Sequence, residues 1–335
     1  MTNPKAKLAE NIFDSPEQKP TRDGLGAGLL ELGESNPNVV ALCADLAEST
    51  RILAFKEKYP ERYVELGVAE QNLATVASGL ANYGKIPFIA SYATFSPGRN
   101  NEQIRTTICI NDVPVKIVGS HAGVSVGPDG ATHQALEDIA LMRVLPRMTV
   151  ISPCDAEEAR KATLAAAAHP GPVYLRLARE KTPVMTTADT PFELGKANVV
   201  WSPSAKESPQ VLIVATGPLL HNALLAAHEL EKSIPVCVMN VHTIKPLDGV
   251  GILKAAKKAG AVVTVEEHQI AGGLGSAVAE YLSSRAALPI EFVGVEDRFG
   301  QSGEPRELIE HYGMGVQSII EAVRRAKRRR IKKEN

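Results

Sequence analysis

Cysteine is scarce in this chain of 335 residues, and its four cysteines lie far apart in the sequence. No two of them form a Cys-x-x-Cys pair, so neither a zinc site nor a disulfide framework is indicated. All four stand in or beside apolar runs, where a free cysteine behaves as a small core residue. We therefore expect free thiols in the core at Cys43, Cys109, Cys154 and Cys237.

The chain also lacks an excess of charge and long apolar runs. Its net charge is -1, so no global field attracts it to nucleic acid or to an anionic membrane. No apolar run reaches the length of a membrane span, and residues 1–20 are too polar for a signal peptide. We expect a cytoplasmic protein without a nucleic-acid or membrane partner. The one basic run, from Arg324 to Lys333, is interpreted as the solvated end of a C-terminal helix.

Short apolar runs alternate regularly with helical patterns along most of the chain. Fully apolar strands that alternate with helices indicate a parallel sheet covered on both faces. The first series of expected strands covers residues 39–43, 63–66, 87–91, 113–119, 148–152 and 172–177. After a stretch interrupted by prolines, a second series covers residues 211–215, 235–240, 261–265 and 289–295.

We therefore predict an α/β protein with two doubly wound domains, the first built on a mainly parallel sheet and the second smaller. A chain of 335 residues is long enough for two cores. The expected divisions are an N-terminal extension at 1–19, a first domain at 20–182, a linker at 183–209, a second domain at 210–328 and a basic tail at 329–335.

Polar side chains gather just after the strands of the first domain, which is where ligands bind in open parallel sheets. The loop at 120–134 packs two histidines, an aspartate and three glycines into fifteen residues. His121 and His133, which flank Asp129, suit a site that moves protons and binds hydroxyls near neutral pH. The sequence therefore predicts a site at this edge of the sheet.

Two helix starts also draw attention. Glu70 falls in the first turn of a helix expected at 69–83, where an isolated acidic residue would merely complement the helix dipole. The small residues that follow it allow another helix to approach closely. At Gly272–Gly275, the glycines lack the spacing of a phosphate-binding motif, so we expect tight strand-to-helix packing there.

Several segments of the chain resemble the C-terminal half of transketolases. They are residues 67–72, 93–95, 120–121, 127–134, 175–179, 265–268, 272–275 and 297–303. The match extends from about Lys19 to Val323 in the family's own order. The chain is similar to the C-terminal subunit of a split transketolase, which implies a thiamine diphosphate pyrimidine-binding domain followed by a transketolase C-terminal domain.

One part of the transketolase pattern is missing. Full-length members carry an N-terminal diphosphate-binding domain with a Gly-Asp-Gly motif, and this chain contains no Gly-Asp-Gly. The resemblance thus implies that thiamine diphosphate binds together with an N-terminal subunit that carries that domain. Mg²⁺, or another divalent metal, would have its ligands on this partner chain and none here. A dimer of heterodimers is the implied assembly.

The resemblance assigns cofactor roles to four residues. Glu70 matches the glutamate that hydrogen-bonds the N1′ atom of the aminopyrimidine ring, a catalytic role because this contact activates the coenzyme. Phe95 matches the aromatic residue that stacks on the pyrimidine, and Tyr92 is a weaker candidate for the same wall. Asp45 matches an interface residue near the cofactor.

The resemblance also assigns a substrate site. His133 matches a catalytic histidine placed to assist proton transfer near the reacting carbons of the sugar. Asp129 matches the aspartate that accepts a hydrogen bond from a sugar hydroxyl. The group that binds the sugar phosphate is matched by Arg22, Ser49, His121 and Arg179. Two guanidinium groups, a hydroxyl and an imidazole converge well on a dianion.

The implied reaction is transfer of a two-carbon ketol unit from a ketose phosphate to an aldose phosphate through a thiamine diphosphate carbanion, as in the pentose phosphate pathway. Alternatives stay open. The loop Asp129–Gln134 weighs against the β subunit of 2-oxo acid dehydrogenase decarboxylases. The enzyme 1-deoxyxylulose-5-phosphate synthase is closer in this loop, but its chain is normally undivided and usually has an arginine in place of His121. Two further alternatives are ketol transfer on an unusual sugar phosphate and a non-catalytic regulatory subunit.

Overall fold

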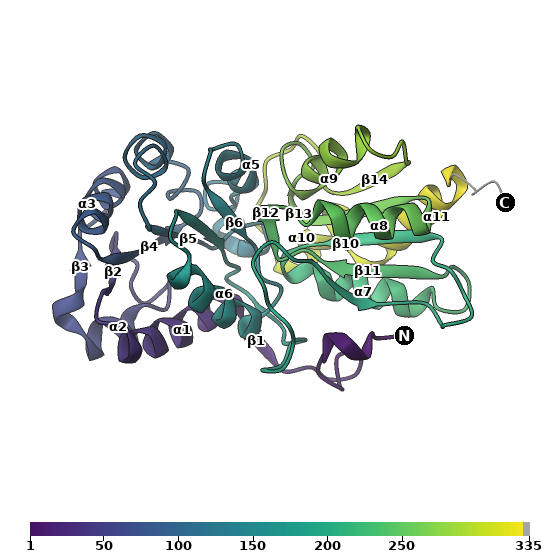
Figure 1. The fold of residues 1–335 in the computed structure, drawn as a ribbon, viewed down its shortest axis with the longest axis horizontal. Helices are drawn as coiled ribbons and strands as arrows, with labels where there is room; N and C mark the ends of the chain where they lie inside the picture. Colours follow the sequence, from purple (N-terminus) through teal and green to yellow (C-terminus); the bar gives the residue numbers. More distant parts are fainter. Residues whose placement is uncertain (331–335) are drawn as a thin grey trace.

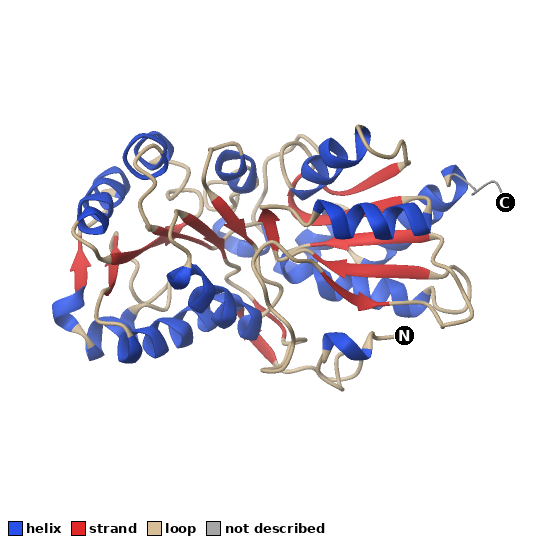
Figure 2. Ribbon diagram, in the orientation of Figure 1, coloured by secondary structure: helices blue, strands red, loops and turns tan. Residues whose placement is uncertain are grey.

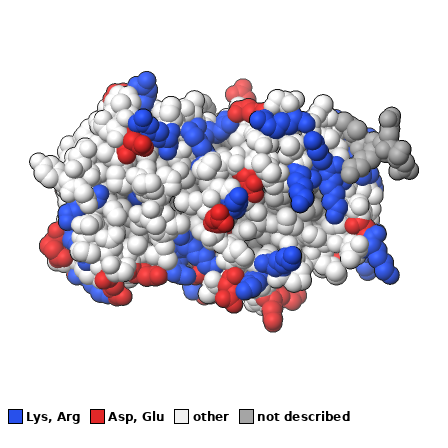
Figure 3. Space-filling view, viewed as in Figure 1, with Lys and Arg blue, Asp and Glu red and all other residues white. Residues whose placement is uncertain are grey.

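The computed structural model describes residues 1–330, which form two α/β domains that lie side by side (Figures 1 and 2). The expected fold class is confirmed, because a mainly parallel seven-stranded sheet is accompanied by a second sheet of five strands. All four cysteines are free and buried, as expected. Acidic and basic side chains are interspersed on the face shown in Figure 3.

The first sheet has the strand order β12-β6-β7-β5-β4-β2-β3. Its strands are β2 (Val39–Cys43), β3 (Tyr63–Glu65), β4 (Ile86–Tyr92), β5 (Lys116–Ser120), β6 (Thr149–Ile151), β7 (Val173–Arg176) and β12 (Thr243–Lys245). All neighbours are parallel except β12, which runs antiparallel to β6. Because the strands β2 to β7 are parallel, the loops that follow them meet at one edge of the sheet.

Helices cover both faces of the first sheet, as Figure 1 shows. One face carries α1 (Thr21–Ser35), α2 (Leu53–Lys58) and α6 (Ala156–Ala168). The other carries α3 (Glu70–Asn82), α4 (Asn101–Gln103), the π-helix η3 (Ile104–Cys109) and α5 (Asp138–Arg143). The short 3-10 helices η2 (Pro60–Arg62) and η4 (Val124–Asp129) lie in the connections. Helices α1 and α6 approach closely because Gly24 has no Cβ atom to collide with Ala156.

The second sheet has the strand order β14-β13-β10-β11-β9. Its strands are β9 (Asn198–Trp201), β10 (Val211–Ala215), β11 (Val236–Asn240), β13 (Val262–Gln269) and β14 (Ile290–Val295). One face is covered by η5 (Gly217–Leu219), α7 (Leu220–Glu229), α10 (Pro305–His311) and α11 (Val316–Arg329). The other face is covered by α8 (Gly249–Ala259) and α9 (Leu274–Ser283).

Three short segments make contacts that the sequence pattern did not indicate. Strand β9 comes from the expected linker but pairs with β11 in the second sheet, and β12 comes from the expected second domain but pairs with β6 in the first. The expected N-terminal extension packs on the second domain, since Ile12 is buried in the core of that domain. These pairings join short segments far apart in the chain, which periodicity does not reveal.

The two ends of the chain also bear on the predicted divisions. The start contributes the 3-10 helix η1 (Pro4–Ala6) and the strand β1 (Gln18–Pro20), which pairs with β8 (Lys181–Pro183). The predicted basic tail begins inside α11, and its residues 331–335 lie outside the described part of the chain. Within residues 1–330, no helix is long and apolar enough to cross a membrane. The predicted domain limits stay predictions.

A buried ion pair of the first domain is joined to the second domain by a hydrogen bond. The Arg176 side chain on β7 donates from Nε to Asp138 Oδ2 over 2.8 Å and from Nη2 to the Glu267 carbonyl oxygen over 2.8 Å. The Tyr174 hydroxyl donates to the same Asp138 oxygen over 2.7 Å. Because both charges are buried, each depends on the other for compensation.

We expect Asp138→Ala to reduce the free energy of unfolding by about 3–5 kcal/mol, because it leaves the Arg176 guanidinium buried without a counter-charge. Urea denaturation of the chain measures this loss. The control is Asp189→Ala, whose residue is exposed and which should change stability by less than about 0.5 kcal/mol. Equal losses for the two variants would contradict the account of the buried pair.

Candidate functional site

A cavity of about 330 Å³ opens at the edge of the first sheet where β2, β4, β5 and β7 end. The structure brings together there six of the side chains singled out in the sequence, together with Glu48 and Arg51, which sequence reasoning missed. The lining residues are Arg22, Glu48, Ser49, Arg51, Tyr92, His121, Asp129 and Arg179. The loops after parallel strands thus converge as the topology requires.

Three guanidinium groups give this cavity its positive character. Arg22, in the first turn of α1, donates from Nη1 to the Ser49 carbonyl oxygen over 2.7 Å, and its Nε atom is buried without a hydrogen-bond partner in the described chain. Burial, followed by the charge of Arg51, lowers the pKa of Arg22. Arg179 donates to the Val126 carbonyl oxygen over 2.6 Å and lies 4.0 Å from Asp129. Clustered cations with a buried unused donor suit an anionic ligand.

His121 lines the cavity and is only 2% exposed. Its backbone φ is 55°, a left-handed conformation that residues other than glycine seldom adopt and that recurs at functional sites. Its ring stacks on Tyr92 with centroids 3.8 Å apart. Burial, followed by the charges of Arg22 and Arg179, lowers its pKa to about 3.

The neutral His121 ring therefore has a definite orientation. Nε2 lies 3.3 Å from Arg22 Nη1, and Nδ1 lies 2.9 Å from the Ser120 hydroxyl oxygen. A guanidinium can only donate, so Nε2 accepts and the Nδ1 proton is left to face Ser120. In this arrangement His121 holds Arg22 in place, an indirect contribution to an anion site.

Aromatic rings form the wall beside the cavity. Phe95 lies 5.9 Å from Tyr92 in a stacked arrangement and 5.4 Å from His133 edge to face. The His133 Nδ1 atom lies 2.9 Å from the Thr132 hydroxyl. The rings of Tyr92, Phe95, His121 and His133 thus make one continuous cluster between the cation pocket and the start of α3. The structure brings these predicted side chains together.

Glu70 is buried at the start of α3, with 1% exposure. Its Oε2 atom accepts from Arg99 Nη1 over 2.7 Å, and its carbonyl oxygen accepts from Asn100 Nδ2 over 2.9 Å. Sequence reasoning missed Arg99, which lies in an irregular loop and has no motif to mark it. A carboxylate this deeply buried needs a partner, so a role limited to the helix dipole is excluded.

The contacts of Arg99 test whether an aminopyrimidine fits here. Its guanidinium lies 5.0 Å from the Phe95 ring centroid while it donates to Glu70. A flat group with an N–H donor can therefore reach the carboxylate and the aromatic face at once. Asn100 Oδ1, buried nearby without a partner in the described chain, is a further acceptor. The residues present fit the ring of thiamine diphosphate, provided that Arg99 moves aside.

Asp45 lies apart from this cluster. It is exposed, has a φ of 60°, and donates its backbone N–H to Glu65 Oε1 over 2.8 Å. Glu65, which sequence reasoning missed, also accepts from the backbone of Leu66 and Gly67 and from the Tyr63 hydroxyl. Burial raises the pKa of Glu65, but these hydrogen bonds outweigh it and the pKa is lowered. Glu65 thereby fixes the loops after β2 and β3.

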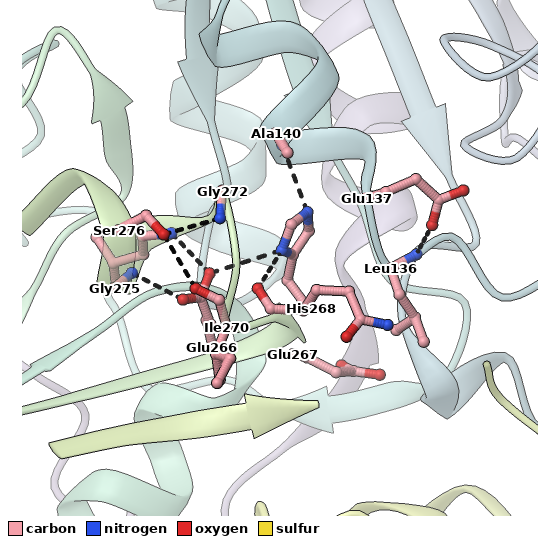
Figure 4. Close-up of polar contacts among 12 residues, drawn as sticks. Leu136, Glu137, Ala140, Glu266, Glu267, His268, Ile270, Gly272, Gly275 and Ser276 are labelled. Carbon is pink, nitrogen blue, oxygen red and sulfur yellow. Dashed lines mark hydrogen bonds and ion pairs between the residues drawn. The ribbon is translucent and has the colours of Figure 1, made fainter. Parts of the chain in front are cut away.

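The glycine cluster at Gly272–Gly275 is not open to a phosphate (Figure 4). The Glu266 carboxylate accepts from the backbone N–H of Leu274 over 2.6 Å and of Gly275 over 2.7 Å. A Cβ atom at Gly273 would collide with that carboxylate. The predicted tight packing is confirmed. Within residues 1–330, no group of three or more His, Cys, Asp or Glu side chains is placed to hold a metal ion.

Comparison with known proteins gives consistent matches. The model of the transketolase pyrimidine binding domain matches residues 17–185, and that of the transketolase C-terminal domain matches residues 202–319. The chain is 40% identical over 295 residues to the 6-deoxy-6-sulfo-D-fructose transketolase subunit SqwH of Clostridium sp. (strain MSTE9), covering 88% of this chain and 90% of that protein. It is 36% identical over 293 residues to a subunit of the apulose-4-phosphate transketolase of Phocaeicola vulgatus, covering 87% and 92%.

A solved structure extends these matches to three dimensions. It is described as a split gene transketolase, inactive beta4 tetramer, and it superposes with a TM-score of 0.85 at 43% identity. The superposition covers 93% of this chain and 99% of that one.

The lowered pKa of His121 predicts a pH dependence of stability. Between pH 6.5, the ordinary pKa, and about 3, the unfolded chain binds a proton at this residue that the folded chain does not. Wild type should therefore lose stability relative to His121→Gln as the pH falls below 6.5, by at most about 1.4 kcal/mol per pH unit. Unfolding curves of both proteins at about pH 7.5 and at about pH 5.5 measure the difference. A difference independent of pH would contradict the neutral, buried ring.

Proposed function

The chain belongs to the transketolase family, and we propose that it is the C-terminal subunit of a split transketolase. The observation that carries this proposal is the share of each relative's length that this chain matches. The chain spans 90% of one relative named as a transketolase subunit, 92% of another, and 99% of a split transketolase of solved structure. The chain therefore matches most of the length of each of these subunits.

We further propose that the chain serves ketol transfer with thiamine diphosphate. When bound, this coenzyme supplies the nucleophilic carbon that accepts the two-carbon unit. Glu70 and Phe95 would hold its aminopyrimidine ring, with Tyr92 behind Phe95 and Asp45 in a supporting place. In support, the Arg99 guanidinium already makes both contacts that the ring requires. Glu70 would exchange a proton with N1′ once Arg99 has moved aside.

The substrate site is proposed to lie next to this ring. His133, edge to face with Phe95, would move a proton at the reacting carbons, and Asp129 would accept a hydrogen bond from a sugar hydroxyl. Arg22 and Arg179, with Ser49, would bind the terminal anion, and His121 would contribute to this substrate site by holding Arg22. Arg51 adds a third guanidinium to the same cavity. The charge of the pocket favours a sugar that ends in a dianion.

The class of sugar is proposed from the relatives. One is named for 6-deoxy-6-sulfo-D-fructose and another for apulose 4-phosphate, so an unusual anionic sugar is a stronger candidate than a common pentose phosphate. Both names describe transketolase subunits, which favours ketol transfer over the deoxyxylulose phosphate synthase reaction.

The proposed assembly includes a second kind of chain. An N-terminal transketolase subunit with a Gly-Asp-Gly diphosphate-binding domain would hold the diphosphate and Mg²⁺, and two such pairs would form a dimer of heterodimers. In support, two relatives are named as transketolase subunits and the similar solved structure is described as a split gene transketolase. The test is to mix the two purified subunits with coenzyme and metal and to assay ketol transfer across several sugar phosphates and sulfonates. Activity of this chain alone would reject the split arrangement.

In the mixed enzyme, we expect Glu70→Gln to lower kcat at least about 100-fold, because a carboxamide cannot share a proton with the ring. The variant should still assemble with the partner, which size-exclusion chromatography measures. Glu102→Gln, an exposed change on α4, is the control and should leave turnover unaltered. Near-normal turnover of Glu70→Gln would remove the assigned role.

We expect Arg179→Ala to raise KM for phosphorylated sugars about 10- to 100-fold, since it removes charge-assisted hydrogen bonds to the dianion. Coenzyme affinity, measured by fluorescence titration, should change little. Arg147→Ala, at an exposed arginine, controls for the loss of surface charge. An equal loss of coenzyme and sugar affinity would count against the anion pocket.

A further inference from the structure

The loop that carries Asp129 and His133 is held by the second domain as well as by its own, in which Arg179 donates to the Val126 carbonyl oxygen over 2.6 Å. Glu267, on β13, is 4% exposed, and its Oε1 atom accepts from the backbone N–H of Ser125 over 2.7 Å. Ser125 lies at the start of η4, which ends at Asp129. A carboxylate of one domain thus fixes the backbone from which a substrate residue of the other projects.

Further contacts from the second domain hold the rest of the loop. The Gln134 side-chain amide donates to the Gln301 carbonyl oxygen over 2.9 Å and also lies within hydrogen-bond distance of the Val124 and Gly127 carbonyl oxygens. A Cβ atom at Gly130 would collide with the Ser302 hydroxyl, so the loop and residue 302 are in close contact. The loop therefore lies against second-domain residues over most of its length.

The loop packs so closely against the Glu267 carboxyl group that a larger residue than glycine would not fit at position 123. Gly123 has a φ of 90°, which favours glycine, and a Cβ atom there would collide with the Glu267 carboxyl group. Burial raises the pKa of Glu267, whereas the nearby Arg176 charge opposes this. A buried carboxyl group is costly, and the Ser125 N–H that it accepts from is itself buried.

The neighbouring Glu266 shows what a purely structural glutamate does on the same strand. Successive side chains of a strand point to opposite faces, and Figure 4 shows the two carboxyl groups lying on opposite sides of the strand. Glu266 caps α9 within its own domain, as its bonds to Leu274 and Gly275 show. Glu267 instead reaches the loop of the first domain. The pair provides a matched comparison.

We propose that Glu267 is a positioning residue for sugar recognition, through which the C-terminal domain sets the loop of Asp129 and His133. Glu267 does not touch the sugar: it holds the Ser125 backbone, and the loop then presents Asp129 to a hydroxyl and His133 to the reacting carbons. The roles of Asp129 and His133 in this inference rest on the proposed function. The contact by which Glu267 holds the loop does not depend on it.

The first test is hydrogen exchange of the full chain, followed by mass spectrometry, in wild type, Glu267→Gln and Glu266→Gln. Because Glu267→Gln weakens the charge-assisted bond to Ser125, amides of residues 124–130 should exchange about 5- to 100-fold faster. Glu266→Gln should speed exchange at the start of α9 and leave 124–130 as in wild type. Unchanged exchange at 124–130 in Glu267→Gln, or equal acceleration in both variants, would overturn the proposal.

The second test uses the mixed enzyme with two ketose donors of opposite configuration at the hydroxyl that Asp129 would contact. Glu267→Gln should reduce the preference between them, as a ratio of kcat/KM values, about 5-fold or more, with unchanged coenzyme affinity. A uniform loss for both donors would overturn the positioning role. The hydrogen-exchange comparison needs no partner subunit, so it tests whether Glu267 holds the loop independently of any enzyme activity. If the wild-type mixture showed no ketol transfer, that result would overturn the proposed function and not the holding of the loop.

Discussion

The ion pair between Glu70 and Arg99 is the interaction on which the site depends. A carboxylate with 1% exposure is tolerated only when a donor meets it, and in this chain that donor is the planar guanidinium of Arg99. The same guanidinium lies over Phe95, so carboxylate, aromatic ring and flat cation form one layer. A coenzyme ring with an N–H donor would replace Arg99 in this layer without leaving the carboxylate unpaired. In this structure Arg99 thus makes the contacts with Glu70 and Phe95 that we propose for the coenzyme ring.

The second domain also contacts the loop that carries Asp129 and His133. Its strand β13 provides Glu267 at the loop of Asp129 and His133, while the Arg176–Asp138 pair locks that strand to the first sheet. The loop that carries Asp129 and His133 is thus fixed from two domains at once. Rigid support of this kind is what a site needs to hold several groups around one ligand.

Much of the fold and part of the site could be predicted from the sequence. Buried runs such as Val39–Cys43 and Val211–Ala215 have no polar face, so they indicated parallel sheets between helices. Parallel strands then required the loops of Ser49, His121 and Arg179 to meet, and they line one cavity. By contrast, Arg99 lies 29 residues from Glu70, and no periodicity or spacing relates the two. The pairing of the three-residue strand β12 and the burial of Ile12 could not be predicted either, because segments this short have no hydrophobic periodicity that would indicate what they pack against.

A structure of this chain with its N-terminal partner and thiamine diphosphate would test the central claim most directly. We predict that Glu70 of this chain lies within hydrogen-bond distance of N1′, that Phe95 faces the ring, and that the Arg99 guanidinium has left the carboxylate. Persistence of the Glu70–Arg99 pair, with the coenzyme ring bound elsewhere, would contradict it.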